Sequence, residues 1–471
     1  MEFLSSYFGH HKDKKIVFFV GNKNDISDLS NLLNTVKFEK CFVLFENPNL
    51  FEKTANFFLD KEDFLCSRVE YINKNELLRT KTNEYAFVFD NYTNVSEMIE
   101  LSKLSPKKFV GFFEKEFDTF SLWEAIKQHC GSIVLARDVD SYRNEVLEWN
   151  KDDGFDYELC VIFPVYKVEN YLIKCLDSVT EWKAPYIEFV FVDDGSPDDS
   201  YKIIQEYAKK DPRVKLLRKE NGGCASARQY GIDHTNSRYI GLIDPDDFID
   251  PTMFHKLLSK AMMGGYDIAY SGYNEYYEET QTSQAIEDLI GEPYTFGLSD
   301  EKAIDNLIAY RRVAIWRGIY RRKFLDINGI RFHTELKRFD DLPFKVETFA
   351  RAKSVVSINE YLYYYRMGRP GQDVSANDER LYIHFEIFKI LDEFFKKYRS
   401  SLQLRHYYQV KVQTHFWGLN LLKPELRADY MEKAAKDLKI QNNKKNWRRI
   451  IKTYYKSKEA RLFIKKMYKK V

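Results

Sequence analysis

The chain has 471 residues, of which 44% are hydrophobic and 31% are charged. This composition is typical of soluble globular proteins and excludes a disordered chain, and the length suggests roughly two to four domains. The six cysteines are scattered without a Cys-x-x-Cys pair. The sequence therefore predicts reduced thiols, and neither a disulfide framework nor a zinc site.

The formal net charge of +2 conceals a basic C-terminal end. Residues 444–471 carry twelve Lys or Arg and one acid, which leaves a net charge of −9 on the preceding 443 residues. The N-terminus shows no basic segment followed by an apolar one, so no secretory signal is expected. No apolar run approaches the ~20 residues of a spanning helix, and the default expectation is a cytoplasmic location.

The first 150 residues show the alternation of an α/β domain. Longer segments with helical spacing, at 25–36 and 119–129, lie among the apolar runs, and Asp25 and Thr119 are plausible N-caps. The short apolar runs are 16–20, 41–45, 85–89, 109–113 and 133–136. The pattern predicts a Rossmann-like parallel sheet. Because Gly21 stands alone, the dinucleotide fingerprint is absent, and a binding or scaffolding role is favoured over a second active site.

A polar, glycine-containing stretch at 148–156 is the expected linker to a second alternation of strands and helices. The predicted helices are 170–180 and 200–210, and the predicted strands are 159–163, 187–192, 214–217 and 239–243. From 376 to 471 no strand is evident, and spacings of three and four predict a helical appendage.

The strand at 239–243 runs into three carboxylates, Asp244, Asp246 and Asp247. Acids at the carboxyl end of a buried strand lie where open α/β folds bind ligands, and their oxygens suit Mg²⁺ or Mn²⁺ bridging substrate phosphates. The alternative is a solvated turn begun by Pro245.

Two further groups follow predicted strands in the same way. Asp193 and Asp194 precede Gly195-Ser196, and Gly222-Gly223 is followed by Arg228. The acids would lie at the same sheet edge, the small residues allow close backbone approach, and the cation suits phosphate oxygens. Each group alone is an ordinary turn or loop.

In order and spacing these groups resemble the inverting family 2 glycosyltransferases of the GT-A fold. The similarity covers roughly residues 157–375 and includes neither the first 150 residues nor the C-terminal end. It is carried by four blocks: Phe163-Pro-Val-Tyr166 with Glu169-Asn-Tyr-Leu172, Val192-Asp-Asp-Gly-Ser196, Asn221-Gly-Gly223 with Ala227-Arg228, and Asp244-Pro-Asp-Asp247. The resemblance implies a GT-A catalytic domain.

The resemblance also implies roles for individual residues. Asp246 matches the metal-binding acid, with Asp247 shaping the loop, while Asp244 faces the ribose. Pro245 replaces the usual Ser. The residues expected to hold the uracil, ribose and diphosphate of the nucleotide-sugar are Pro164, Tyr166, Asp193, Asp194, Gly222, Gly223 and Arg228.

Asp341 takes the place of the family's catalytic base, and Asp340 replaces the usual Glu before it. Displacement at an anomeric carbon requires a base within hydrogen-bond reach of the acceptor hydroxyl. The alternative for this pair is the N-cap of a helix that starts near Leu342.

Arg366 and Arg369 resemble the segment that closes over the donor diphosphate, although a basic surface turn is the alternative. Some relatives supply a His metal ligand there, but this sequence has none between Asp341 and His384. The expected Mn²⁺ or Mg²⁺ is therefore held by Asp246, the diphosphate and water, and His333 is expected to be a loop histidine.

Aromatic and aliphatic residues interleave with cations in residues 444–471, as in helices that bind anionic membrane surfaces. A solvated basic helix is the alternative, and no nucleic-acid module accompanies the charge.

The sequence thus predicts a metal-dependent inverting glycosyltransferase on the cytoplasmic side of the membrane. It would transfer a sugar from a nucleotide-sugar, most simply a UDP-sugar, to a saccharide or lipid-linked acceptor. The family and composition associate it with bacterial capsule or lipooligosaccharide synthesis. The alternatives are a non-catalytic saccharide- or nucleotide-binding protein on the same scaffold, and a bifunctional polysaccharide polymerase.

Overall fold

The computed structural model divides into two compact units, 1–154 with 262–265, and 155–261 with 266–471. The predicted helix at 25–36 and the basic segment 444–471 lie outside the described residues. The residues that the structure describes are 15–20, 40–45, 69–71, 77, 85–90, 94–113, 118–140, 143–151, 153–286, 307–308, 312–369, 376–397 and 401–439.

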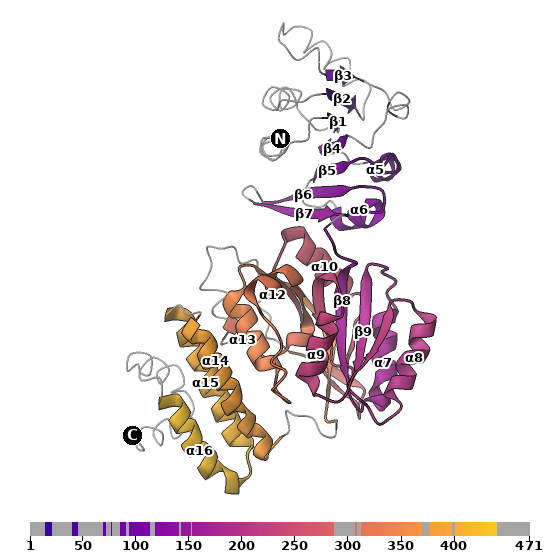
Figure 1. The fold of residues 1–471 in the computed structure, drawn as a ribbon. Helices are drawn as coiled ribbons and strands as arrows, with labels where there is room; N and C mark the ends of the chain where they lie inside the picture. Colours follow the sequence, from indigo (N-terminus) through magenta and orange to yellow (C-terminus); the bar gives the residue numbers. More distant parts are fainter. Residues whose placement is uncertain are drawn as a thin grey trace. The chain divides into compact units, whose positions relative to one another are not determined.

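The first unit contains a seven-stranded sheet in the order β3-β2-β1-β4-β5-β6-β7 (Figure 1). All neighbouring strands are parallel except β6 and β7. The strands are β1 (Lys15–Val20), β2 (Lys40–Phe45), β3 (Val69–Tyr71), β4 (Ala86–Asp90), β5 (Lys108–Phe113), β6 (Ser132–Asp140) and β7 (Arg143–Asn150). The parallel α/β architecture predicted for this part is confirmed.

Two local predictions for this unit differ from the structure. The boundary between the two units falls after Gly154, within the stretch 148–156 that was expected to be a linker, but residues 148–150 of this stretch belong to β7, where they pair antiparallel with β6. Helix α6 (Thr119–Ile126) is capped by Asp118, whose carboxylate accepts a hydrogen bond from Ser121 N at 3.0 Å, and not by Thr119. Helix α5 (Val95–Ser102) is capped by Asn94 in the same way.

The second unit begins with the predicted βα repeats. Strands β8 (Tyr157–Val165), β9 (Ile187–Asp193), β10 (Val214–Arg218) and β11 (Ser237–Leu242) are parallel, in the order β10-β9-β8-β11. Every residue of β8 after Tyr157 is buried, as expected for a strand covered on both faces. The connecting helices are α7 (Glu169–Thr180), α8 (Ser200–Lys210) and α9 (Cys224–Asp233).

The order of strands reverses between β8 and β11, because the chain moves from β8 to β9 on one side and returns to β11 on the other. In open α/β sheets, ligands bind at such a switch point, at the carboxyl ends of the strands. The predicted residues from 164 to 166, 193 to 194 and 244 to 247 all follow this edge.

Beyond β11 the sheet becomes mixed. Strand β15 pairs antiparallel with β11 and β13, β13 pairs parallel with β16, and β12 pairs antiparallel with β16. These elements are β12 (Phe248–Ile249), α10 (Met253–Gly264), β13 (Ile268–Tyr277), β14 (Thr282–Ala285), η2 (Ile315–Arg317), β15 (Gly318–Arg321), α12 (Arg322–Asn328), α13 (Asp341–Arg351) and β16 (Val355–Met367).

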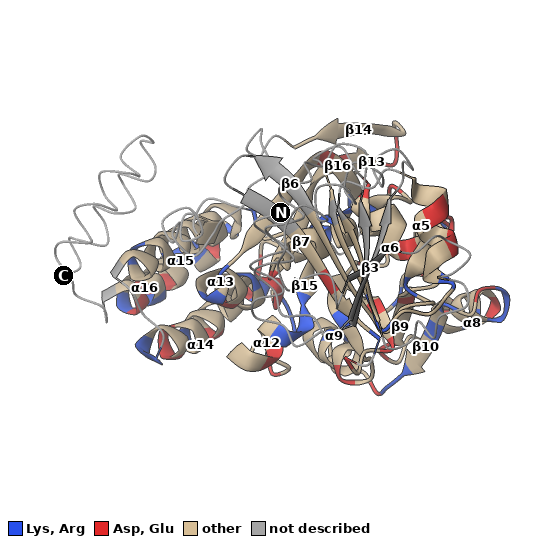
Figure 2. Cartoon of the chain, turned by 90° about the horizontal axis from the view of Figure 1, so that it is seen from above, with Lys and Arg blue, Asp and Glu red and all other residues tan. Residues whose placement is uncertain are grey.

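Helices complete the described chain, as predicted. They are η4 (Glu379–Tyr382), α14 (Ile383–Lys397), α15 (Ser401–Leu421) and α16 (Pro424–Lys439), and the three α-helices lie side by side in Figures 1 and 2. Ile387, Phe388 and Leu391 of α14 belong to the same hydrophobic core as Val346 and Phe349 of α13. The helical region is therefore packed on the body of the second unit.

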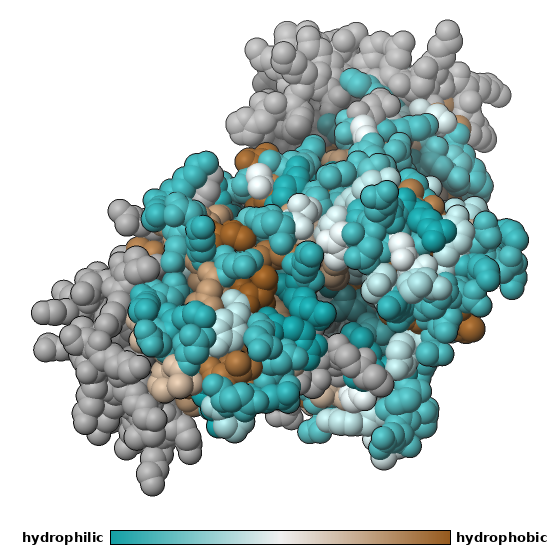
Figure 3. Space-filling view, turned by 60° about the horizontal axis from the view of Figure 1, so that its bottom comes forward, coloured by the Kyte–Doolittle hydropathy of each residue, from teal (hydrophilic) through white to brown (hydrophobic). Residues whose placement is uncertain are grey.

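On the face shown in Figure 3, hydrophilic residues cover most of the described surface and apolar residues gather in separate patches. No helix within the described ranges is long and apolar enough to cross a membrane. Among the described cysteines, Cys130, Cys160 and Cys175 are buried free thiols.

Candidate functional site

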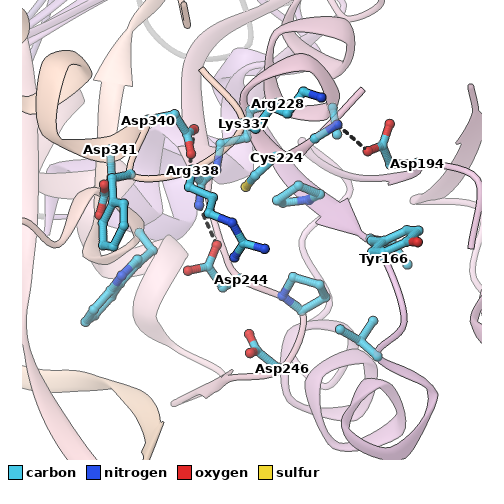
Figure 4. A pocket seen from close by; sticks show the side chains of 18 of the residues that line it. Tyr166, Asp194, Cys224, Arg228, Asp244, Asp246, Lys337, Arg338, Asp340 and Asp341 are labelled. Atoms are coloured by element: carbon cyan, nitrogen blue, oxygen red, sulfur yellow. Dashed lines mark hydrogen bonds and ion pairs between the residues drawn. The ribbon is translucent and has the colours of Figure 1, made fainter. Parts of the chain in front are cut away.

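A cavity of about 640 Å³ lies at the carboxyl edge of the second unit's sheet. This volume is within the range of small-molecule sites. In Figure 4, Asp340 and Asp341 lie on one side of it, Asp194 and Tyr166 lie on the other, and Asp244 and Asp246 lie between them. Ten of the twelve predicted site residues line it: Pro164, Tyr166, Asp194, Gly222, Gly223, Arg228, Asp244, Asp246, Asp341 and Arg369.

The loop after β11 carries Asp244, Asp246 and Asp247 and is here called the acid loop. Residues of β16 bond to it and hold it in place. Asp247, which is 1% exposed, accepts hydrogen bonds from Tyr363 Oη and from Arg366 N, each at 2.7 Å. Burial and the nearby carboxylates of Asp246 and Asp244 raise the pKa of Asp247 well above its usual range. Asp247 thus fixes the loop, which is the role expected from its sequence.

Arg366 does not line the cavity, although the sequence predicted a phosphate clamp. It is 2% exposed, donates from Nε to the backbone carbonyl of Asp246 at 2.7 Å, and forms an ion pair with Glu278. Its guanidinium also lies 5.0 Å from the centre of the Tyr171 ring. The buried guanidinium of Arg366 therefore supports the acid loop and does not face the cavity.

Asp246 does face the cavity, where its carboxylate forms an ion pair with Arg369. Burial raises the pKa of Asp246; Arg369 opposes this shift, and the charge of Asp244 adds to it. Within the described residues, no group of three or more His, Cys, Asp or Glu could hold a metal ion. A buried carboxylate beside a second one does fit the oxygen chemistry of Mg²⁺ or Mn²⁺, provided that a substrate supplies further oxygens.

Asp194, on the opposite side of the cavity from Asp341, holds the loop that contains Gly222 and Gly223, here called the glycine loop. Its carboxylate accepts hydrogen bonds from Lys219 Nζ at 2.7 Å, from Gly223 N at 2.7 Å and from Gly222 N at 3.0 Å. Gly223 has φ +90°, and a Cβ on Gly222 would lie 2.7 Å from Ser226 Oγ. The backbone conformation at position 223 therefore favours glycine, a side chain at position 222 would displace Ser226 or Lys219, and the amide groups of both glycines bind a protein carboxylate in this structure.

Asp193, expected to contact the donor, is not among the residues that line the cavity. It is fully buried, accepts a hydrogen bond from Ser196 N at 3.2 Å, and lies 3.1 Å from Arg218 Nε. Its carboxylate closes the turn after β9, and Asp194, the next residue, is the one that reaches the cavity surface.

Arg228, on α9, connects two of the acids that line the cavity. Its Nη2 donates to Asp244 at 2.5 Å and its Nη1 donates to Asp340 at 2.7 Å, and the side chain is 5% exposed. The sequence places these partners 16 and 112 residues away from Arg228. One guanidinium therefore joins Asp244, after β11, to Asp340, in the loop that carries the expected base.

Asp341 is the first residue of α13, and Asp340 occupies the N-cap position. Asp340 makes no side-chain capping bond, because its carboxylate is directed to Arg228. The pair therefore lies at the start of a helix, as the N-cap alternative predicted, but Asp340 does not make the capping hydrogen bond.

The pKa of Asp341 is raised from 3.8 to about 7. Burial is the main cause, the charge of Asp340 adds to it, and Arg228 opposes it. A carboxyl group that titrates near neutral pH is matched to proton transfer.

Several cavity residues were assigned no individual role from the sequence, although the stretches 316–324 and 338–344 resemble the acceptor half of the family. Trp316 stacks on Tyr363 with ring centroids 4.0 Å apart, and Lys337, Arg338 and Phe339 precede the expected base. Two signals could have identified them: this resemblance and, for the three residues that precede Asp340, a position two to four residues before Asp341.

An open sheet with an Asp-x-Asp loop at its switch point, and further acids on the same cavity, is the arrangement expected for a GT-A glycosyltransferase domain. The sequence profile of "Glycosyl transferase family 2" matches residues 160–324. This part of the chain belongs to that family.

Named relatives agree with the assignment. The chain is 30% identical over 210 residues to "Uncharacterized glycosyltransferase EpsJ" of Bacillus subtilis, covering 44% of this chain and 60% of EpsJ. It is 38% identical over 111 residues to "Minor teichoic acid biosynthesis protein GgaB" of the same organism, covering 23% of this chain and 12% of GgaB. The chain therefore spans less than two thirds of the length of either relative.

Among solved structures, S. aureus TarS 1–349 in complex with UDP-GlcNAc is similar with a TM-score of 0.42 and 20% identity. The similarity covers 63% of this chain and 91% of that one.

Proposed function

We propose that this protein is an inverting glycosyltransferase that moves one sugar from a nucleotide-sugar, in the simplest case a UDP-sugar, to a hydroxyl of an acceptor. The observation that carries the proposal is Asp341, a carboxyl group with a pKa of about 7 on the cavity that also contains Asp194, Asp244 and Asp246. One cavity thus has a base on one side and acids suited to a nucleotide on the other.

In the proposed reaction Asp341 accepts the proton of the acceptor hydroxyl. The hydroxyl oxygen forms a bond to the anomeric carbon while the bond from that carbon to the diphosphate breaks. The nucleoside diphosphate leaves with the electron pair, and one displacement inverts the anomeric configuration. Arg228 fixes Asp340 beside the base, so the carboxyl group of Asp341 is held at the helix start while the reaction proceeds.

The donor side is assigned to Tyr166, Pro164 and Asp194. Tyr166 is 44% exposed at the cavity, so its ring is available for a uracil base to stack on. Asp194 is held by the glycine loop and offers its remaining lone pairs to the nucleoside. Arg369 lies close enough to Asp246 to exchange this carboxylate for a donor phosphate.

Asp246, together with the donor diphosphate, is assigned to a Mn²⁺ or Mg²⁺ ion. The ion would neutralise the charge that develops on the leaving diphosphate. Arg369 balances the Asp246 carboxylate in its present arrangement.

The acceptor is proposed to be a saccharide or lipid-linked saccharide of a bacterial surface polymer. This setting is supported by the similarity to GgaB, whose name refers to minor teichoic acid biosynthesis. The first unit is assigned a binding or scaffolding role, and the basic segment 444–471 is assigned to an anionic membrane surface on the cytoplasmic side. Nucleic acid is not among the proposed partners.

A panel of nucleotide-sugars tests the proposal. The purified protein is incubated with each donor and a crude glycolipid acceptor preparation, with Mn²⁺ or with EDTA, and release of the nucleoside diphosphate is measured. Metal-dependent release from at least one donor is expected. Binding of nucleotide without release from any donor would favour the non-catalytic alternative, and polymeric products would favour the polymerase.

A further inference from the structure

The residue immediately before the Asp340–Asp341 pair has a strained backbone. Phe339 has φ +54°, a conformation that a bulky side chain rarely adopts, and its ring lines the cavity. Such a conformation persists only where the surrounding structure holds it. The contacts of this ring therefore determine how the carboxylates that follow it are presented.

Two C-terminal helices hold the Phe339 ring. Its centroid lies 5.2 Å from that of His384 on α14 and 6.2 Å from that of Trp417 on α15. His384 and Trp417 also contact one another, with centroids 5.8 Å apart in an edge-to-face arrangement. The three rings form a cluster that joins the loop before α13 to the helical region.

A buried polar chain fixes His384 in turn. Burial and the neighbouring His415 lower the pKa of His384 to about 3, so its imidazole stays neutral. Tyr430 Oη, on α16, lies 3.3 Å from His384 Nδ1 and 3.1 Å from His415 Nδ1. His415 Nε2 lies 2.9 Å from Asp437 Oδ2.

The protons of this chain have one consistent arrangement. Neutral His415 donates from Nε2 to Asp437 and accepts the Tyr430 hydroxyl proton at Nδ1, so His384 donates from Nδ1 to Tyr430. Lys411, which is fully buried, joins Asp437 at 2.9 Å to Asp392 at 2.8 Å. These ion pairs connect α14, α15 and α16, and the three helices together hold the His384 ring in place.

We propose that helices α14–α16 position the catalytic carboxylate by clamping Phe339, so that Phe339, His384 and Trp417 are positioning residues for sugar transfer. The inference rests on the proposed function. It assigns the helical region a task in the chemical step, although none of the described residues of these helices lines the cavity.

Trp417 is the best residue to change, because it is 37% exposed and its removal leaves the deep core intact. Trp182 supplies a matched control: it is also 37% exposed, and its ring centroid lies 4.9 Å from that of His255. Trp417→Ala is expected to lower kcat roughly tenfold to a hundredfold, the range for a slightly misplaced catalytic group. Trp417→Phe should restore most of the activity, and Trp182→Ala should resemble the wild type.

Gly418→Ala provides an independent disturbance of the same cluster. A Cβ at this position would lie 2.9 Å from Tyr430 Oη and 3.5 Å from His384 Nδ1, so the polar chain must shift. This variant should also lose kcat. For both variants the affinity for UDP with Mn²⁺, measured by calorimetry, should stay within twofold of the wild-type value, because the donor side is untouched.

A second measurement does not depend on turnover. If the clamp keeps Asp341 buried, Trp417→Ala hydrates this carboxyl group and its pKa falls towards the ordinary value of 3.8. The decrease in stability that is expected for the wild type between pH 5 and pH 8 should then become smaller in Trp417→Ala and remain in Trp182→Ala.

Equal kcat in Trp417→Ala and Trp182→Ala, with the same pH dependence of stability, would overturn the inference while leaving the proposed function standing. A loss of UDP affinity equal to the loss of kcat would also overturn it. If the wild type releases no diphosphate from any donor, the proposed function fails, and the role in sugar transfer fails with it.

Discussion

Replacing Asp341 with Asn should abolish transfer and, at the same time, stabilise the protein above neutral pH. The carboxyl group has a pKa of about 7 in the folded protein, against 3.8 when it is unperturbed. The folded state therefore binds the proton more tightly than the unfolded state, and the wild type loses stability as pH rises between these two values. The side-chain amide of the Asp341→Asn variant would remain neutral throughout, so the variant would escape this loss.

The size of the effect follows from the shift of about three pKa units, each worth about 1.4 kcal/mol. Relative to the wild type, Asp341→Asn should gain about 1.7 kcal/mol at pH 5 and about 4 kcal/mol at pH 8 from this term. The gain at pH 8 exceeds the gain at pH 5 by about 2 to 3 kcal/mol. Any effect of the new amide that does not depend on pH cancels in this comparison.

Urea unfolding of both proteins at pH 5 and pH 8 measures this difference. Transfer assays on the same samples should show a loss of roughly 10²–10⁴-fold, the usual contribution of a general base. A stability difference that is the same at both pH values would show that Asp341 titrates as an ordinary aspartate and would refute the reasoning.

Four other changes test separate parts of the site. Asp340→Asn removes a neighbouring negative charge, so the acid limb of the kcat–pH profile should move to lower pH by about one unit. Asp246→Asn should abolish Mn²⁺-dependent UDP binding in calorimetry, whereas Asp199→Asn at the exposed start of α8 should not. Gly222→Ala places a Cβ 2.8 Å from Lys219 Nζ, so the Lys219–Asp194 contact should loosen and the donor KM should rise severalfold. Deleting 444–471 should reduce sedimentation with anionic vesicles at low salt.

Each of these has a clear contrary result. A shift of the acid limb to higher pH would place the dominant charge elsewhere than Asp340. Unchanged Mn²⁺-dependent affinity in Asp246→Asn would remove this residue from the metal site. An unaltered KM in Gly222→Ala would separate the glycine loop from donor binding, and equal sedimentation of the truncated chain would contradict the membrane assignment.

The sequence predicted the parallel part of each sheet because hydrophobic runs separated by helical segments are local signals. The predicted strands at 159–163, 187–192 and 214–217 lie within β8, β9 and β10. Polar alternation in β7 gave no such run, so residues 148–150 were interpreted as a linker. Its strand character comes from pairing with β6, which is tertiary information.

The site could be predicted in outline because its acids follow strands whose carboxyl ends meet at one edge. What each side chain contacts could not be predicted. Arg366 donates a hydrogen bond to the backbone of Asp246, which is 120 residues earlier in the chain. Arg228 donates one to Asp340, which is 112 residues later. Partners so distant are decided by the packing of β16 and α13 against the parallel strands. The Asp193–Asp194 pair is similar: both carboxylates are buried, but only Asp194 lines the cavity, and nothing in the sequence distinguishes the two.

The central claim is that Asp341 removes the acceptor proton in transfer from a nucleotide-sugar. Single-turnover release of the nucleoside diphosphate, with acceptor present, compares the wild type with Asp341→Asn at pH 8 at equal donor occupancy. The account predicts rapid release by the wild type and a loss of at least about a hundredfold in the variant, with UDP affinity unchanged. Release at similar rates by both proteins would contradict it.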